Sequence, residues 1–158
     1  MMMFRPMQED EYPDYLAYFI PDYAQEIASN YRIPVEASQT RAEQEIAKML
    51  PEGVKTPGQT LLCLTMCCEQ TEQHIGYIWY QPDTVMRTVF ICDFHIFSAC
   101  QGQGLGKKAL SAFEQNLQQQ GFEQVRLRVA GDNTRARHVY EASGFGVTGI
   151  NMSKTITG

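Results

Sequence analysis

The stretch Gln101-Gly102-Gln103-Gly104-Leu105-Gly106-Lys107 decides the fold, because it joins two segments with opposite patterns. Before it, residues 88–97 are apolar on both faces except for Asp93 and His95, which is typical of a strand inside a sheet. After it, residues 105–117 repeat apolar side chains at helical spacing. A glycine-rich turn from a buried strand into a helix directs backbone N–H groups and the positive end of the helix dipole at one point. We therefore expect an anion-binding site at this turn.

The spacing of the turn excludes two common phosphate-binding loops. A Walker A loop needs glycine five residues before Gly106 and serine or threonine after Lys107, whereas Gln101 and Lys108 stand there. A dinucleotide fingerprint starting at Gly102 would need glycine at position 107. Neither class of nucleotide-binding domain is therefore expected.

What remains is a Q-x-x-G-x-G pattern, and with it the sequence resembles the GNAT superfamily of N-acetyltransferases, whose motif is [RQ]-x-x-G-x-[GA]. A second segment is similar to the family's other signature at the usual distance downstream, and it reads Asn133-x-x-Ala136-Arg137-x-x-Tyr140-x-x-x-Gly144-Phe145. The resemblance covers roughly residues 60–147. Among subgroups the chain resembles uncharacterised bacterial acetyltransferases of the YycN type, in the Asp-Phe pair of the strand and in the Asn-x-x-Ala-Arg segment.

This resemblance implies an acetyl-CoA-dependent enzyme in which a primary amine attacks the thioester directly in a ternary complex. It implies that the backbone N–H of Ile96 contacts the thioester carbonyl, that Phe97 and Ser98 pair with the pantetheine amides, and that Asn133 contacts the arm from the facing side. The pyrophosphate would lie on Gln101, Gly102, Gln103, Gly104, Leu105, Gly106 and Lys107. Tyr140 matches the family's general acid, although a tyrosine at helical spacing is otherwise a common core residue.

The general base is left open between Asp93 and His95, which lie two residues apart and so share one face of their strand. Polar groups on a buried strand are costly unless they are hydrogen-bonded, so the pair is either structurally satisfied or lines the substrate cleft. The family often has an acidic residue at the position of His95. This departure puts the identity of the base in doubt.

The hydropathy pattern predicts an α/β (α+β) fold of one domain over residues 1–158. From the order of the predicted elements we expect a mixed, mainly antiparallel central sheet flanked by helices, and the resemblance to the GNAT superfamily implies that the sheet is splayed between two parallel central strands. Pro21 should kink or split the first helical region. The expected strands are 1–6, 60–68, 74–80, 88–97, 122–130 and 145–156, and the expected helices are 12–27, 36–50, 105–117 and a last one from Asn133 to Gly144.

Composition and charge limit the kinds of binding partner that we expect. The net charge is −5, which argues against nucleic acid and anionic membranes, and no apolar run approaches the length of a bilayer span, so we expect a cytoplasmic protein. Residues 1–100 carry −8 and residues 101–158 carry +3, which suits a small-molecule or peptide amine acceptor that is cationic. The five cysteines include no C-x-x-C pair, so we expect buried reduced thiols and no metal.

Two rival functions and one assembly question stay open from the sequence. The alternative to an enzyme is a CoA-binding sensor or regulatory module of the same fold without turnover, and the presence of Tyr140 favours the enzyme. The acceptor amine, the pathway and the oligomeric state, a homodimer included, are not identified by the sequence.

Overall fold

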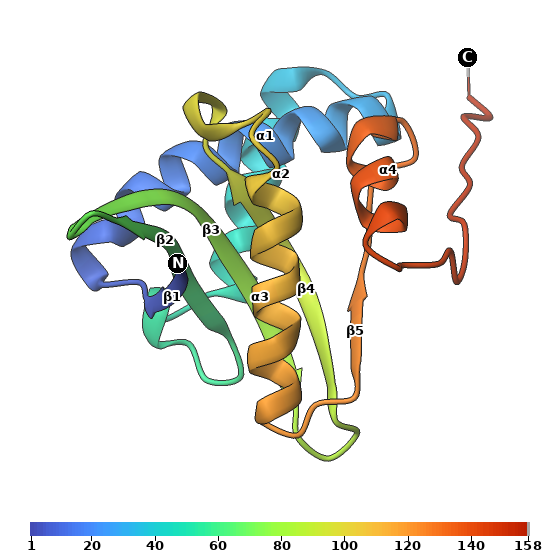
Figure 1. The fold of residues 1–158 in the computed structure, drawn as a ribbon. Helices are drawn as coiled ribbons and strands as arrows, with labels where there is room; N and C mark the ends of the chain where they lie inside the picture. The colour runs from blue at the N-terminus through green and yellow to red at the C-terminus, as the bar shows by residue number, and fades with distance from the viewer. Residues whose placement is uncertain (158) are drawn as a thin grey trace.

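The structure is a computed structural model that describes residues 1–157. Figure 1 shows a mixed sheet with helices packed on it, which confirms the predicted fold class. The elements are β1 (Met2–Pro6), α1 (Tyr12–Tyr31), α2 (Val35–Met49), β2 (Thr60–Cys68), β3 (Thr71–Asp83), β4 (Thr88–Ile96), α3 (Leu105–Gln119), β5 (Gln124–Leu127) and α4 (Thr134–Ala142). Three short 3-10 turns cover Glu9–Glu11, Gly53–Lys55 and Ser98–Cys100.

The sheet has the strand order β1-β2-β3-β4-β5, in which all neighbours are antiparallel except β4 and β5. The parallel pair is short, because it runs only from Thr88 opposite Gln124 to Ile91 opposite Leu127. Beyond Ile91 the two strands separate while β4 continues to Ile96. The predicted splay between two parallel strands is therefore present.

The outer end of the sheet differs from the prediction in two ways. The expected strand 122–130 is shortened to β5, and residues 145–157 form no strand although their side chains alternate. Within the described chain β5 is consequently an edge strand and not a central one. The physical reason is that a strand needs a neighbour to hydrogen-bond with, and residues 145–157 lie away from the edge of β5.

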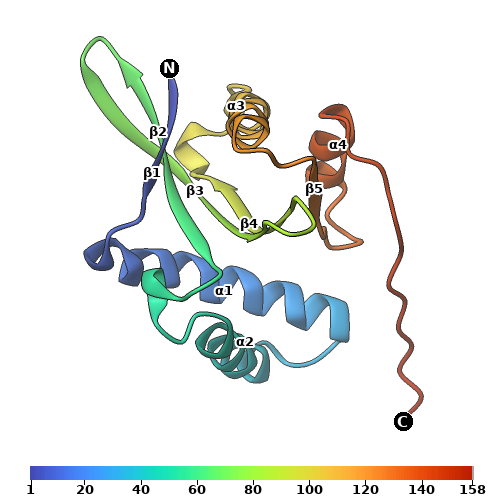
Figure 2. The same cartoon turned by 90° about the horizontal axis from the view of Figure 1, so that it is seen from below.

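Alternating side chains divide the core into two layers. Tyr77 and Trp79 of β3 pack under α1 and α2, whereas Ile78 and Tyr80 of the same strand pack against α3. Figure 2 shows this arrangement, with α1 and α2 on one face of the sheet and α3 and α4 on the other. Burial of a side chain such as Phe113 of α3 contributes about 1.5–3 kcal/mol.

Helix α1 continues through Pro21, so of the two expected effects of this residue, a kink or a split, the split does not occur. A proline inside a helix costs about 3 kcal/mol, because one backbone hydrogen bond is lost. Pro21 is on the exposed side, and the buried contacts of Phe19 before it and of Ala24 and Ile27 after it hold the two halves together. Among residues 1–157, no helix is both long and apolar enough to cross a bilayer.

The unbroken α1 reaches across the sheet to the β5 side (Figure 2). Near its end, Glu26 pairs with Arg128 at 3.3 Å, and the Ser29 hydroxyl donates a hydrogen bond of 2.6 Å to Asp132. Both partners lie just after β5. The second half of α1 therefore covers the gap in which β4 and β5 separate.

Candidate active site

The end of β4 presents one backbone donor toward the gap. The N–H of Phe97 donates to the carbonyl of Ile75 in β3 at 2.8 Å. Successive N–H groups of a strand point to opposite edges, so the N–H of Ile96 points away from β3, toward the side of β5. Since β5 does not pair with β4 beyond Ile91, this donor faces the gap.

The geometry limits the contacts that the next two residues, Phe97 and Ser98, can make with a ligand. The N–H of Phe97 is already used, and its carbonyl accepts from Cys100 at 2.8 Å, so only the second lone pair of that carbonyl is left for an amide. Ser98 is exposed and begins a 3-10 turn. Of these two residues, Ser98 would therefore supply most of the backbone contacts to an extended ligand.

The glycine-rich turn ends in an open helix start. Gly104 is the N-cap of α3 and has φ of 73°, in the left-handed region that favours glycine. The first backbone bond of the helix runs from Lys108 N–H to Gly104 carbonyl at 3.2 Å, so the N–H groups of residues 105–107 have no intrahelical acceptor. Gly104 has no side chain to cap them. Three donors and the positive end of the helix dipole are thus directed at one place, as predicted.

The turn is fixed to the end of β4. The Gln101 side chain donates from Nε2 to the carbonyl of Ile96 at 2.8 Å, which connects the first residue of the motif to the strand that faces the gap. Leu105 is buried in the core, whereas residues 101–104 and Lys107 are exposed. The motif therefore holds the free backbone N–H groups of residues 105–107 next to the end of β4.

Asp93 lies on β4 and is held by two tyrosines of α1. The hydroxyl of Tyr15 donates to Oδ2 at 2.8 Å, and the hydroxyl of Tyr18 donates to Oδ1 at 3.2 Å. Burial raises the pKa of Asp93 to about 7; the two hydrogen bonds lower it in part, and the charges of Asp22 and Glu26 raise it further. The carboxyl group is consequently about half ionised at neutral pH.

His95 shares the α1 face of β4 with Asp93, as predicted. Its ring stacks on Tyr18, with 3.9 Å between centroids and 16° between planes, and lies edge-on to Phe97 at 5.8 Å. Burial lowers the pKa of His95 below its ordinary 6.5, and the charge of Asp22 opposes this shift. His95 is therefore mainly a neutral imidazole near pH 7.

Tyr140 of α4 and Asn133, the N-cap residue of α4, lie on the other side of the gap. The ring of Tyr140 packs edge-on against Phe145 at 5.6 Å, and burial together with the charge of Asp93 raises its pKa to about 12. Oδ1 of Asn133 accepts the N–H of Ala136 at 3.1 Å and so caps the start of α4, where the sequence predicts the last helix to begin. Because Oδ1 is occupied, a ligand contact of Asn133 falls to its Nδ2 group.

The sequence analysis did not predict the hydrogen bonds of Tyr15 and Tyr18 to Asp93. A signal existed. A carboxyl group on a buried strand requires donors, and residues spaced by three share one face of a helix. Which of the tyrosines would meet Asp93 could not be read from the sequence.

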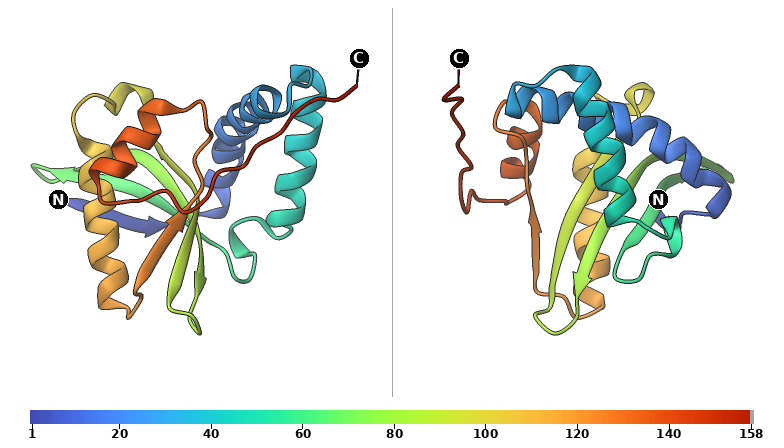
Figure 3. Two further views of the ribbon diagram at one scale, coloured as in Figure 1. Left: turned by 90° about the vertical axis from the view of Figure 1, so that its right-hand side faces the viewer. Right: turned by 180° about the vertical axis from the view of Figure 1, so that it is seen from behind.

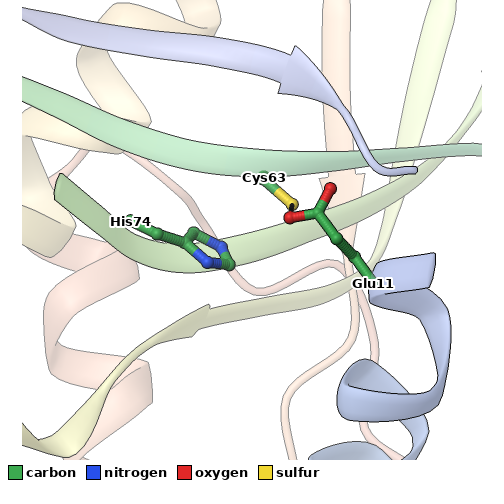
Figure 4. Close-up of side chains that lie close together, drawn as sticks. All are labelled: Glu11, Cys63 and His74. Atoms are coloured by element: carbon green, nitrogen blue, oxygen red, sulfur yellow. Dashed lines mark hydrogen bonds between the residues drawn. The ribbon is translucent and has the colours of Figure 1, made fainter. Parts of the chain in front are cut away.

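A second group of polar side chains lies outside the gap (Figure 4). Glu11, Cys63 and His74 place potential metal-binding atoms within 4.8 Å of one another. Both oxygens of Glu11 are already bound by the Arg5 guanidinium, at 2.7 and 2.8 Å, and burial raises the pKa of the Cys63 thiol to about 11. A metal ion would have to displace the Arg5 guanidinium from Glu11 and a proton from the Cys63 thiol. The group instead ties β1, the Glu9–Glu11 turn and β2 together.

The cysteines agree only in part with the expected burial. Cys63 and Cys100 are buried, Cys92 is half-buried, and Cys67 and Cys68 are exposed at the end of β2. The exposed pair lies beside Glu69–Gln70, the two-residue turn of the β2–β3 hairpin, in which both residues have positive φ.

Comparison with known proteins gives consistent matches. The sequence model of the acetyltransferase (GNAT) family matches residues 12–145. The chain is 32% identical to the uncharacterised N-acetyltransferase YycN of Bacillus subtilis, over 98% of this chain and 99% of YycN, and 26% identical to YdgE of the same species over 95% of each. The crystal structure of YycN superposes with a TM-score of 0.90 over 100% of both chains. The PaiA N-acetyltransferase of Thermoplasma acidophilum, solved with coenzyme A, has a TM-score of 0.70 at 16% identity and covers 96% of this chain and 93% of its own, so it shares the fold.

Proposed function

Because the chain belongs to the GNAT family of acetyltransferases, we propose that it moves an acetyl group from acetyl-CoA to a primary amine by direct attack in a ternary complex. The observation that carries the proposal is the gap between β4 and β5. A turn with three free backbone N–H donors lies at its end, another backbone donor faces it, and ionisable groups with shifted pKa values lie on both sides. Perturbed groups that converge on one opening are typical of a catalytic site.

The residues present fit acetyl-CoA. The N–H groups of residues 105–107 and the exposed Lys107 and Lys108 suit a pyrophosphate, and Gln101 holds this turn against β4. The N–H of Ile96 is directed into the gap, where it would donate to the thioester carbonyl and stabilise the negative charge that forms on that oxygen. Ser98 and Nδ2 of Asn133 would hold the pantetheine arm from its two sides.

Protons are handled by the pair of ionisable groups across the gap. As the amine nitrogen bonds to the acetyl carbon, Asp93 accepts its proton, directly or through water, because its carboxylate form is populated at neutral pH. As the carbon–sulfur bond breaks, Tyr140 donates its proton to the sulfur. The raised pKa of Tyr140 keeps that proton in place at neutral pH. Tyr15 and Tyr18 act as positioning residues that hold both carboxylate oxygens of Asp93.

We expect Tyr140→Phe to lower kcat by about ten- to a thousandfold with little change in acetyl-CoA affinity, as for loss of a general acid. The phenylalanine ring keeps the packing against Phe145. Steady-state kinetics and calorimetry on the same preparation check both statements. Tyr80→Phe is the matched control, because Tyr80 is a buried tyrosine of the same core cluster.

The same pair of variants separates the enzyme from a CoA-binding sensor of the same fold. If the protein is an enzyme, we expect turnover that Tyr140→Phe reduces and Tyr80→Phe leaves unchanged. If it is a sensor, we expect the wild-type protein and both variants to bind acetyl-CoA without amine-dependent thiol release. Near-normal kcat in Tyr140→Phe, in contrast, would mean that Tyr140 contributes packing and is not the general acid.

The acceptor we propose is a cationic amine, such as a polyamine, an aminoglycoside or a lysine side chain. Residues 1–100 carry −8, and the covering helix α1 brings Asp22 and Glu26 close enough to shift the pKa of Asp93. Glu26 is paired with Arg128, whereas Asp22 is exposed. Acidic groups beside an opening attract cations and raise the rate of encounter.

We expect kcat/KM for cationic amines to fall several-fold as salt rises from about 0.01 to about 0.15 M, where the screening length shrinks from about 30 to about 8 Å. Asp22→Asn should weaken this dependence, whereas Asp10→Asn, a change of the same kind on the Glu9–Glu11 turn, should leave it unchanged. A panel of amines at the two salt concentrations checks this. A preference for neutral or anionic acceptors, or rates that do not depend on salt, would contradict electrostatic attraction and leave acetyl transfer untouched.

A further inference from the structure

Sulfur-bearing residues occupy one end of the β1–β2 pair. Residues 1–3 at the start of β1 and residues 66–68 at the end of β2 all carry sulfur, and they are Met1, Met2, Met3, Met66, Cys67 and Cys68. The antiparallel register places these two runs side by side. The left view of Figure 3 shows the start of β1 beside the turn between β2 and β3, on the opposite side of the molecule from α2.

Strand alternation divides these side chains between the two faces of the sheet. Met2 is opposite Met66, and both pack half-buried against the core cluster that includes the residues of α3. Their thioethers therefore serve packing. The other face carries Met1, Met3 and Cys67, because side chains two residues apart on a strand point the same way. These three are exposed, Met1 to 83% and Met3 to 48%.

The register brings the three exposed side chains together. Met1 and Cys67 exchange two backbone hydrogen bonds, because the Cys67 N–H donates to the Met1 carbonyl at 3.1 Å and the Met1 amino group donates to the Cys67 carbonyl at 3.2 Å. Such a pair lies directly opposite, with about 5.5 Å between Cα atoms. Met3 is opposite Thr65 and so lies diagonal to Cys67, within reach of a long side chain. Since methionine has three rotatable bonds, the three sulfur atoms can meet at one ion.

We propose that Met1, Met3 and Cys67 form a binding site for one Cu(I) ion on the exposed face of the β1–β2 pair. Thioether and thiolate sulfurs are soft ligands that select Cu(I), whereas Zn²⁺ takes cysteine, histidine and carboxylate ligands, of which this set holds one. The ion replaces the proton of the Cys67 thiol, so the loaded site is electrically neutral. The sequence analysis expected no metal because no C-x-x-C pair occurs, but such motifs detect only ligands close in sequence, and Met1 and Cys67 are 66 positions apart.

The surroundings favour a sulfur-only site that is independent of acetyl transfer. Glu72, opposite Cys67 in the β2–β3 register, pairs with Arg5 at 3.4 Å, and a carboxylate is a hard ligand that suits Cu(I) poorly. In the strand order β1 lies at one side of the sheet, whereas the gap between β4 and β5 lies at the other. Copper binding is therefore measured without reference to activity.

Anaerobic competition of the full chain with bicinchoninate, a coloured Cu(I) chelator, measures the affinity. Cys67→Ser should lower it by about a hundredfold and Met3→Leu by about tenfold, because each variant loses one soft ligand. The matched controls are one residue away. Cys68→Ser and Met2→Leu make the same changes on the other face of the strands and should leave the affinity unchanged. A wild-type protein that does not take Cu(I) from bicinchoninate, or equal losses in Cys67→Ser and Cys68→Ser, overturns the proposal.

X-ray absorption at the copper edge, on protein loaded with one equivalent of Cu(I), tests the ligand set. We expect only sulfur neighbours around the metal, and one fewer in Met3→Leu. Nitrogen or oxygen neighbours, as from His74 or Glu72, overturn the assignment. Sedimentation equilibrium of the loaded protein should give the same mass as the metal-free protein. A doubling of mass on loading would mean that copper bridges the exposed thiols of two chains, which also overturns a site within one chain.

Discussion

Asp93→Asn should lower kcat by about a hundred- to ten-thousandfold, which is the usual contribution of a general base, while acetyl-CoA affinity changes little. Asparagine keeps the shape of the side chain and one oxygen that accepts from Tyr15 or Tyr18, so the loss is the ability to take a proton. Burial penalises the charged carboxylate, so the wild-type protein loses stability from Asp93 as pH rises from about 3.8 to about 7. The uncharged variant does not lose this stability, so its melting temperature at pH 8 should be no lower than that of the wild-type protein.

The pH profile distinguishes the two candidate bases. A base acts only when deprotonated, so with Asp93 in this role kcat/KM falls as pH drops below about 7. His95 has a pKa lowered from 6.5, so a limb due to this residue would appear at a more acidic pH. We expect the limb near 7 to persist in His95→Gln and to vanish in Asp93→Asn. A limb below 6.5 that His95→Gln abolishes would assign the base to His95.

Gly104→Glu should reduce acetyl-CoA binding by at least a hundredfold, the largest change in affinity that we expect. The new carboxylate would stand where the N–H groups of residues 105–107 meet the pyrophosphate, and it would offer them an acceptor of the same charge. A side chain at this position is also strained, because φ is 73°. Calorimetric titration with acetyl-CoA measures the loss.

Gly121→Glu is the matched control for this experiment. Gly121 follows the other end of α3, with φ of 92° and no atom within 4 Å of an added Cβ, so the backbone strain, the added charge and the free space are alike. We expect acetyl-CoA to bind Gly121→Glu as it binds the wild-type protein. Unchanged affinity in a folded Gly104→Glu would remove the glycine-rich turn from the account of cofactor binding.

Local pattern predicted most elements of this fold, because alternation and helical spacing report which side chains face the core. The buried strand β4, the turn at Gly104 and the N-cap Asn133 all follow from residues that lie close together in the sequence. Pro21 shows the limit of such reasoning. Its local cost of about 3 kcal/mol is outweighed by the packing of a 20-residue helix that no local window includes.

The sequence could name most residues of the candidate site but not the contacts between them. The two motifs single out Tyr140 and the glycine-rich turn, and the polar positions in an otherwise apolar strand single out Asp93 and His95. The hydrogen bonds of Tyr15 and Tyr18 to Asp93 join residues 78 and 75 positions apart, so only the folded chain reveals them. Likewise, the alternation of residues 145–156 predicts a strand but does not name its partner.

The most direct test of the central claim is acetyl-CoA-dependent thiol release by the wild-type protein across a panel of primary amines, with the products identified by mass spectrometry. The account predicts that thiol release requires the amine, matches the acetylated amine mole for mole, and leaves no acetyl group on the protein. It also predicts that cationic amines head the panel. Binding of acetyl-CoA without amine-dependent thiol release, or an acetylated protein as an intermediate, would contradict direct transfer.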